Sequence, residues 1–440
     1  MRKLFENINF RLLFAGNLVS EVGNSLFNVA MSFYVLELTD ENVAAMGMFL
    51  FVVTGIRILA SPLAGVLVDR WKSIRVIYMT DYARAILFVL LGLYIIGGPS
   101  DGKIVIALYI IGILSSISAA LFGPAMTKAL PEIVGEDMLQ AANGAQSIVM
   151  SVQSIIGVLA GAAIYYFIGI EWIIALNAIS FGLSGFSEMF IKAKYVKELS
   201  FDEIENKKSQ THTQDFFESL RYIKSKTGLL NLVGFSLILN FAFTPLFAIG
   251  IPYLFKTDLA RVNYAMEYAY TEVAFSIAML VAGITIGSMV IKSINRVIKI
   301  GLIFLSTSFA YIAFTMYLAS TGKIEFSTFY VMFIVGMVFL ATFMMLTNVP
   351  LNTGMVKIVD PNYRGRVFST VGAISAGAIP FSFLLGGYIV KFYGITGLGL
   401  FCVLVMMIPT FGFLTNKKVK ILIDSIDKNN KEIARLQEAV

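Results

Sequence analysis

The chain has 440 residues, of which 58% are hydrophobic and 14% charged. A soluble globular domain averages about 25% charged residues, so this composition excludes an ordinary water-soluble enzyme or binding module and predicts a polytopic membrane protein. The formal net charge is +6. Its Lys and Arg residues gather between the apolar runs, which indicates membrane orientation and gives no reason to expect a nucleic-acid partner.

Twelve apolar runs follow one another, each long enough for a bilayer-crossing helix, which needs about 20 residues. A membrane β-barrel would instead show alternating segments of about 10 residues. The sequence therefore predicts an all-α membrane protein with twelve transmembrane helices. The predicted spans are residues 10–36, 44–68, 76–97, 104–127, 141–168, 171–193, 229–255, 267–291, 298–320, 325–350, 367–391 and 397–415.

The first span carries Asn17, Glu21, Asn24 and Asn28 on one helical face. Glu21 follows Phe10 by about 16 Å along the helix axis, near the bilayer centre. A charge at that depth costs from ~2.5 to more than 10 kcal/mol, so such residues usually line a polar cavity or form a pair. We expect a cavity-lining face with Glu21 as proton carrier or cation anchor; the alternative is a hydrogen-bonded seam between helices.

The second span contains Arg57 midway along it, at a depth where it could pair with Glu21 or bind an anionic group. Asp69, Arg70 and Arg75 surround the junction with the third span, at its expected cytoplasmic rim. In the third span Asp81 and Arg84 are three residues apart, which permits a local ion pair.

Later spans carry fewer polar residues at helical spacing. Gln146 and Gln153 are seven apart in the fifth span, and Asn240 and Thr244 are four apart in the seventh. These side chains either complete a cavity wall or bridge neighbouring helices.

The longest hydrophilic stretch, residues 194–228, divides the chain into two sets of six spans that resemble each other weakly. The segment 65–77 at the end of the second span resembles 287–298 at the end of the eighth. Such duplication is common in secondary transporters, with the substrate site between the halves. We expect two pseudo-symmetric six-helix bundles, at 1–193 and 229–415, a cytoplasmic central loop at 194–228 and a cytoplasmic tail at 416–440.

Placing both termini in the cytoplasm leaves few basic residues at the opposite side, in agreement with the positive-inside rule. The basic residues at outer loops or ends are then Lys103, Lys256, Arg261, Lys323 and Lys391.

Several motifs resemble the major facilitator superfamily along essentially the whole chain. Gly65 to Arg75 is similar to its loop signature between helices 2 and 3. The runs Asn9–Phe14, Phe122–Ala125 and Arg364–Phe368 are similar to the drug:proton antiporter branch that contains bacterial macrolide-efflux proteins. Two positions depart from the pattern. Helix 5 reads Gly157-Val158-Leu159-Ala160-Gly161 without proline, and the loop has Lys72-Ser73 where a second glycine is usual.

The resemblance implies a monomeric secondary transporter of the bacterial cytoplasmic membrane, surrounded by membrane lipids, that exports hydrophobic or amphipathic compounds such as macrolide-like drugs in exchange for protons. It also implies a gating role for Asp69, with Arg70, Arg75, Asp81 and Arg84 around it. The alternatives are a lysophospholipid or other lipid translocator, a siderophore exporter, and a non-transporting membrane receptor or assembly partner.

Enzyme and cofactor chemistry are not expected. The single His212 stands in a polar stretch, the single Cys402 lies in the last span, and the chain has no phosphate-binding glycine-lysine loop. We therefore expect no cofactor, no zinc and no ATP-driven step within this chain.

Overall fold

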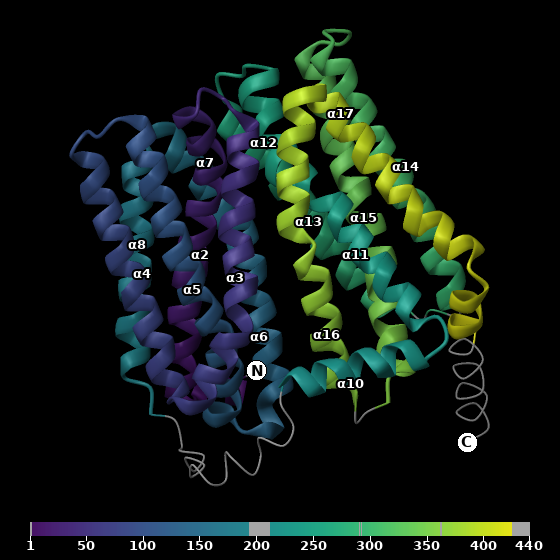
Figure 1. Ribbon diagram of the computed structural model, residues 1–440, viewed down its shortest axis with the longest axis horizontal. Helices are drawn as coiled ribbons and strands as arrows, with labels where there is room; N and C mark the ends of the chain where they lie inside the picture. Colours follow the sequence, from purple (N-terminus) through teal and green to yellow (C-terminus); the bar gives the residue numbers. More distant parts are fainter. Residues whose placement is uncertain (1, 193–211, 290, 292, 361–362, 425–440) are drawn as a thin grey trace. The chain divides into compact units, whose positions relative to one another are not determined.

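The computed structural model describes residues 2–192, 212–289, 291, 293–360 and 363–424. Every regular element in these ranges is a helix, and none of the described residues forms a strand (Figure 1). The helices pack into two compact units, each built from segments that are distant in the sequence.

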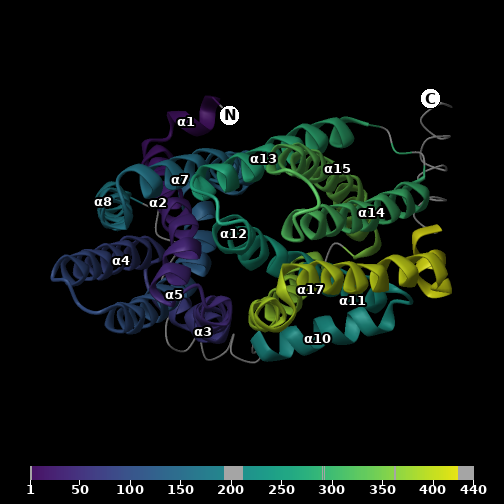
Figure 2. The same cartoon turned by 90° about the horizontal axis from the view of Figure 1, so that it is seen from above.

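The first unit combines Met1–Glu198 with two later segments, Ile251–Val273 and Phe383–Lys391. Within it α4 packs against α8 and α5, α2 against α8, and α3 against α5 (Figure 2). Its helices from the first part of the chain are α1 (Arg2–Glu6), α2 (Ile8–Leu38), α3 (Val43–Arg70), α4 (Ser73–Ile96), α5 (Asp101–Val134), η1 (Glu136–Met138), α6 (Leu139–Val152), η2 (Gln153–Gly157), α7 (Val158–Phe167) and α8 (Ile170–Met189).

The second unit combines Leu199–Gly250, Ala274–Ser382 and Phe392–Val440. Within it α14 packs against α15, and α10 packs against α16. The remaining helices, some of which run through both units, are α10 (His212–Ser225), α11 (Leu229–Pro245), η3 (Leu246–Gly250), α12 (Ile251–Tyr253), η4 (Leu254–Asp258), α13 (Tyr264–Ser288), α14 (Ile294–Ser320), α15 (Phe326–Ile358), α16 (Arg364–Gly377) and α17 (Ile379–Thr415).

Ten helices in the described part of the chain are long and apolar enough to cross a membrane. The polar helix α2 is not among them, although its 31 residues exceed the needed length. The last of the ten covers Arg366–Thr415 and contains a break at Gly394, whose φ of 67° lies in the left-handed region that favours glycine. The prediction of an all-α membrane protein is confirmed, and the count of exactly twelve spans stays a prediction.

The division into halves at residues 194–228 also stays a prediction, because residues 193–211 lie outside the described part. The rest of that stretch contains α10, which buries Ile223 against Val233, Met355 and Val367. Arg366 forms an ion pair with Glu218 of α10 at 3.1 Å. The central stretch is therefore attached to the second unit through α10.

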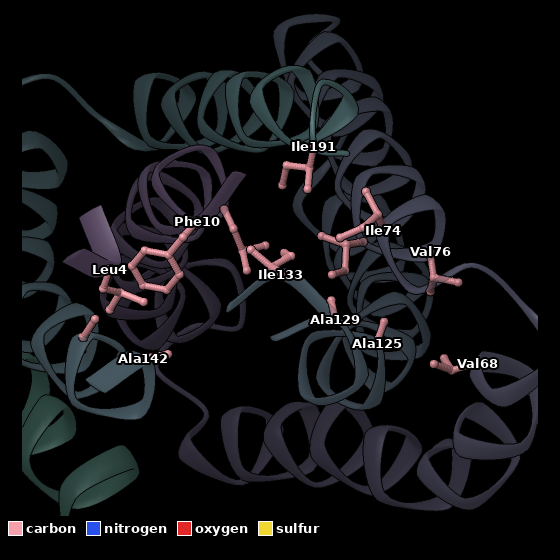
Figure 3. Close-up of a cluster of buried hydrophobic side chains, with 13 residues drawn as sticks. Leu4, Phe10, Val68, Ile74, Val76, Ala125, Ala129, Ile133, Ala142 and Ile191 are labelled. Carbon is pink, nitrogen blue, oxygen red and sulfur yellow. The ribbon is translucent and has the colours of Figure 1, made fainter. Parts of the chain in front are cut away.

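An apolar cluster holds together one end of the first unit, where α2 and α4 begin and α3 and α5 end (Figure 3). Phe10 and Leu4 lie near the start of the chain, Val68 near the end of α3, Ile74 at the start of α4 and Ile133 at the end of α5. All five side chains are buried. The cluster fixes the junction between α3 and α4 that carries the predicted gating residues.

The segment of α17 that belongs to the first unit contacts α3 backbone to backbone. A Cβ atom added at Gly47 would lie 2.7 Å from the carbonyl oxygen of Phe383, and one at Gly387 would lie 2.9 Å from that of Val43. Two glycines are therefore needed for this close approach, which joins segments far apart in the sequence.

Candidate functional site

The polar face of α2 is partly buried inside the first unit. Asn17 is buried, and its side-chain amide donates a hydrogen bond to Oε1 of Gln146 in α6 at 2.9 Å. Glu21 and Asn24 are half-buried, and Asn28 is exposed. Two of the predicted site residues are thus brought together, and α2 is joined to α6 by a side-chain contact.

Arg57 lies exposed on α3, and no hydrogen bond or ion pair joins it to Glu21 among the described side chains. Both groups nevertheless act electrostatically on Arg84 of α4. Glu21 and Arg57 therefore make no direct contact among the described side chains.

Gln153 begins η2, a single π-helical turn between α6 and α7. Its Oε1 atom is buried and has no hydrogen-bond partner among the described residues. Such turns inside membrane helices are frequent at functional sites, because the extra residue redirects one side chain. Gln153 stays a candidate binding residue.

Asn240 and Thr244 belong to α11 in the second unit and bond to their own helix. The amide of Asn240 donates to the carbonyl oxygen of Ser236 at 2.9 Å, and the hydroxyl of Thr244 donates to that of Asn240 at 2.7 Å. Both side chains therefore bond within α11, and they stay candidate site residues.

The predicted gating residues divide into exposed and buried sets. Arg70 and Arg75 are exposed, and the side chain of Asp69 lies outside the described side chains. Lys128 of α5, which the sequence did not single out, donates to the carbonyl oxygens of Val68 at 3.1 Å and Trp71 at 3.0 Å. A cation at the carboxyl end of a helix is favourable, and here it also satisfies carbonyl groups that the helix leaves unpaired.

Asp81 and Arg84 form the expected local ion pair, with 3.0 Å between Oδ1 and Nη2, but both are buried. The guanidinium also lies over the rings of Phe122 at 5.0 Å and Phe181 at 4.5 Å. Cation–π contacts of this kind gain strength when water is excluded. Arg84 is therefore held from three sides within the first unit.

Glu188 of α8 is the residue that sequence reasoning missed at this place. It is fully buried, and Ser184 donates a hydrogen bond to its Oε1 at 3.3 Å. Asp81 and Arg84 both act on it electrostatically. A signal was present, because Asn177, Ser184 and Glu188 follow helical spacing along α8 and make a polar face in an apolar span.

A second charged cluster forms at the C-terminal end of α2. Lys256 of η4 lies 3.3 Å from Glu37 and donates to the carbonyl oxygen of Phe33 at 3.1 Å. Tyr165 of α7 donates its hydroxyl to Glu37, and the Lys256 ammonium lies 5.1 Å from the ring centre of Tyr264. These residues tie a late segment of the chain to the first unit.

The fold and these buried charges define the class: a multi-pass membrane protein built from long helices with polar side chains inside them. The model of the Major Facilitator Superfamily matches residues 13–346, and the chain belongs to that family of transporters. This membership identifies a transporter and not an enzyme, as the sequence indicated.

Two relatives and one solved structure extend the comparison. The uncharacterized MFS-type transporter YkuC of Bacillus subtilis (strain 168) is 26% identical over 66% of this chain and 67% of its own. Macrolide efflux protein A of Streptococcus pyogenes is 22% identical over 86% of this chain and 88% of its own. A bacterial homologue of the iron transporter ferroportin, solved in an inward-facing state, has a TM-score of 0.73 at 13% identity, covering 93% of this chain and 99% of that one. The expected resemblance to macrolide-efflux proteins is confirmed.

Proposed function

We propose that this protein exports hydrophobic or amphipathic organic compounds, such as macrolide-like drugs, and couples their export to the entry of protons. The similarity to macrolide efflux protein A along most of both chains supports export and this substrate class. The protein would act as a monomer of twelve spans in the cytoplasmic membrane, with both termini in the cytoplasm.

The observation that carries proton coupling is the polar face of α2. Glu21 stands half-buried in it, and the Asn17–Gln146 hydrogen bond holds that face against α6. An ionisable group inside a membrane span is costly and is usually retained for a function in an ion or substrate pathway. Glu21 is therefore a proton carrier or a cation anchor, with Asn24, Asn28 and Gln153 as further substrate contacts.

The charged residues at the junction of α3 and α4 would control access from the cytoplasmic side. This proposal concerns Asp69, Arg70 and Arg75, whose loop is fixed by the apolar cluster and by Lys128. Charge contacts at such a rim bias the transporter toward one of its two access states without altering substrate affinity in either state.

The test uses the full chain in liposomes with an imposed pH gradient, one neutral macrolide and one cationic dye. Gradient-driven accumulation of both compounds, abolished by a protonophore, is expected for the parent protein. Glu21→Gln is expected to abolish uphill transport of both if Glu21 carries the proton, and of the cationic dye alone if it anchors cations.

A matched control is Glu171→Gln, which removes an exposed carboxyl at the start of α8. If accumulation by the parent protein did not depend on the pH gradient, that result would contradict proton coupling. If the protein moved a fluorescent lysophospholipid but neither the macrolide nor the dye, lipid translocation would replace drug export as the proposed function.

A further inference from the structure

Where α4 packs against α8 in the first unit, these helices carry two buried carboxyl groups and one buried guanidinium. Asp81 and Glu188 have no exposed surface, and Arg84 is 4% exposed. The helices that carry them, α4 and α8, pack directly against each other. If both carboxyl groups were ionised, one negative charge would lie buried without a counter-charge, which costs several kcal/mol even after relaxation.

Each of the two carboxyl groups also has one oxygen atom without a hydrogen-bond partner among the described residues. Oδ2 of Asp81 and Oε2 of Glu188 are buried and have no hydrogen-bond partner among the described residues. Buried polar atoms are nearly always paired, so two such atoms on helices that pack against each other indicate a missing hydrogen. A protonated carboxyl donates a hydrogen bond that an ionised one lacks.

We propose that Asp81 and Glu188 share one proton beside Arg84, and that this shared carboxyl pair is a proton-binding site of the transporter. The proposal rests on the proposed proton-coupled function and adds to it a site on α4 and α8. Two carboxyl groups that interact strongly ionise as a pair, with one proton retained over a wide pH range.

Arg84 is the fixed charge of this site. Its guanidinium stays protonated, and its ion pair with Asp81 and its contacts with Phe122 and Phe181 hold it in place. The ring of Phe181 in turn stacks on that of Phe88, with 5.9 Å between the ring centres. The site therefore changes its net charge only through its carboxyl groups.

The helices around the pair bring two more charges, Glu21 of α2 and Arg57 of α3, both of which act on Arg84. The α5 helix contributes the ring of Phe122 to this environment. Because Glu21 lies on the helix proposed to carry substrate contacts, a change in its charge or position alters the proton affinity of the pair.

A glycine on α2 lets that helix approach Glu188 closely. A Cβ atom at Gly16 would lie 2.7 Å from Oγ of Ser187, 3.0 Å from Oγ of Ser184 and 3.2 Å from Oε1 of Glu188. The α2 backbone therefore lies close against Glu188. Separation of α2 from α8 would admit water to Glu188 and release the proton, whereas close packing retains it.

Infrared difference spectroscopy of the full chain tests whether the pair holds a proton. The parent protein at neutral pH is expected to show the carbonyl stretch of a protonated carboxyl. Glu188→Gln and Asp81→Asn should each lower the intensity of this band, because the remaining carboxyl then pairs ionised with Arg84. Glu171→Gln should retain it. A band absent from the parent protein, or unchanged in intensity in both the Glu188→Gln and Asp81→Asn variants, would overturn the site.

Transport in liposomes supplies the second readout. One proton exchanged per substrate lets a gradient of one pH unit support about tenfold accumulation. Glu188→Gln should lose this accumulation and keep exchange of substrate at equal pH on both sides. If accumulation by the parent protein did not depend on the pH gradient, the proposed function would be overturned. The infrared band would then still test whether the carboxyl pair holds a proton. Full accumulation by the Glu188→Gln and Asp81→Asn variants of a coupled parent would overturn the site alone.

Discussion

Two charged clusters of the first unit use similar groups in opposite settings. In the first cluster, Asp81 and Arg84 are three residues apart on one helix, and both side chains are at most 5% exposed. In the second, Glu37 is on α2 and Lys256 on η4, and the Glu37 side chain is 57% exposed while that of Lys256 is 8% exposed.

The difference lies in how each ion pair can be broken. The Asp81–Arg84 pair belongs to one helix, so no movement between helices separates it, and only a change of protonation alters its charge. The Glu37–Lys256 pair joins distant segments, and water can solvate Glu37 when they part. The first cluster is therefore suited to hold a proton and the second to hold a conformation.

The largest effect is expected for Arg84→Leu, which leaves two carboxyl groups in the interior without a cation. Removing one partner of a buried ion pair typically costs about 3–5 kcal/mol. We expect a corresponding loss in thermal unfolding of the detergent-solubilised protein. Adding Asp81→Asn to this variant should recover part of the loss, and an unchanged unfolding temperature in Arg84→Leu would contradict the buried-pair description.

A smaller effect is expected for Lys256→Met, which keeps the apolar stem and removes the charge. Exposed or half-exposed ion pairs contribute about 0–1 kcal/mol, because water replaces the lost partner of Glu37. Lys323→Met is the matched control, since Lys323 lies 2.6 Å from the hydroxyl of Tyr317 only six residues away. Faster opening of the C-terminal end of α2, measured by labelling of an introduced cysteine, should occur for Lys256→Met and not for the control.

The smallest effect is expected for Tyr165→Phe, which removes the hydroxyl that bonds to Glu37 and keeps the ring contact with Phe33. A hydrogen bond of this kind contributes about 0.5–1.5 kcal/mol, and the exposure of Glu37 favours the low end. Combined with Lys256→Met, the two changes should be non-additive in unfolding, because both act on one carboxylate. Strict additivity would show that the two contacts are independent.

The sequence predicted well those features that depend on neighbours in the chain. Apolar runs of the needed length predicted the long helices. Asp81 and Arg84 pair as their spacing predicts. Even the low hydropathy of α2 follows from the polar face that made it the first candidate site.

The contacts that the sequence did not predict join residues far apart in the chain. Glu188 meets Asp81 and Arg84 only because α4 packs on α8, and Lys256 meets Glu37 only because η4 reaches the end of α2. Helical spacing identifies a polar face on each helix but not the helix that it contacts. The π-helical turns that reset this spacing, such as η2, also have no clear sequence signature.

The position of Lys128 has a mechanical consequence. Its ammonium group holds the carbonyl oxygens of Val68 and Trp71, at the last turn of α3 and the first residue after it. Ser73, the first residue of α4, donates to Glu132 on the same helix as Lys128. Three helix ends are thereby fastened together at one junction, so a rotation of α5 carries the ends of α3 and α4 with it. Spin labels placed on these three ends would keep constant mutual distances while the whole junction tilts relative to the lipid.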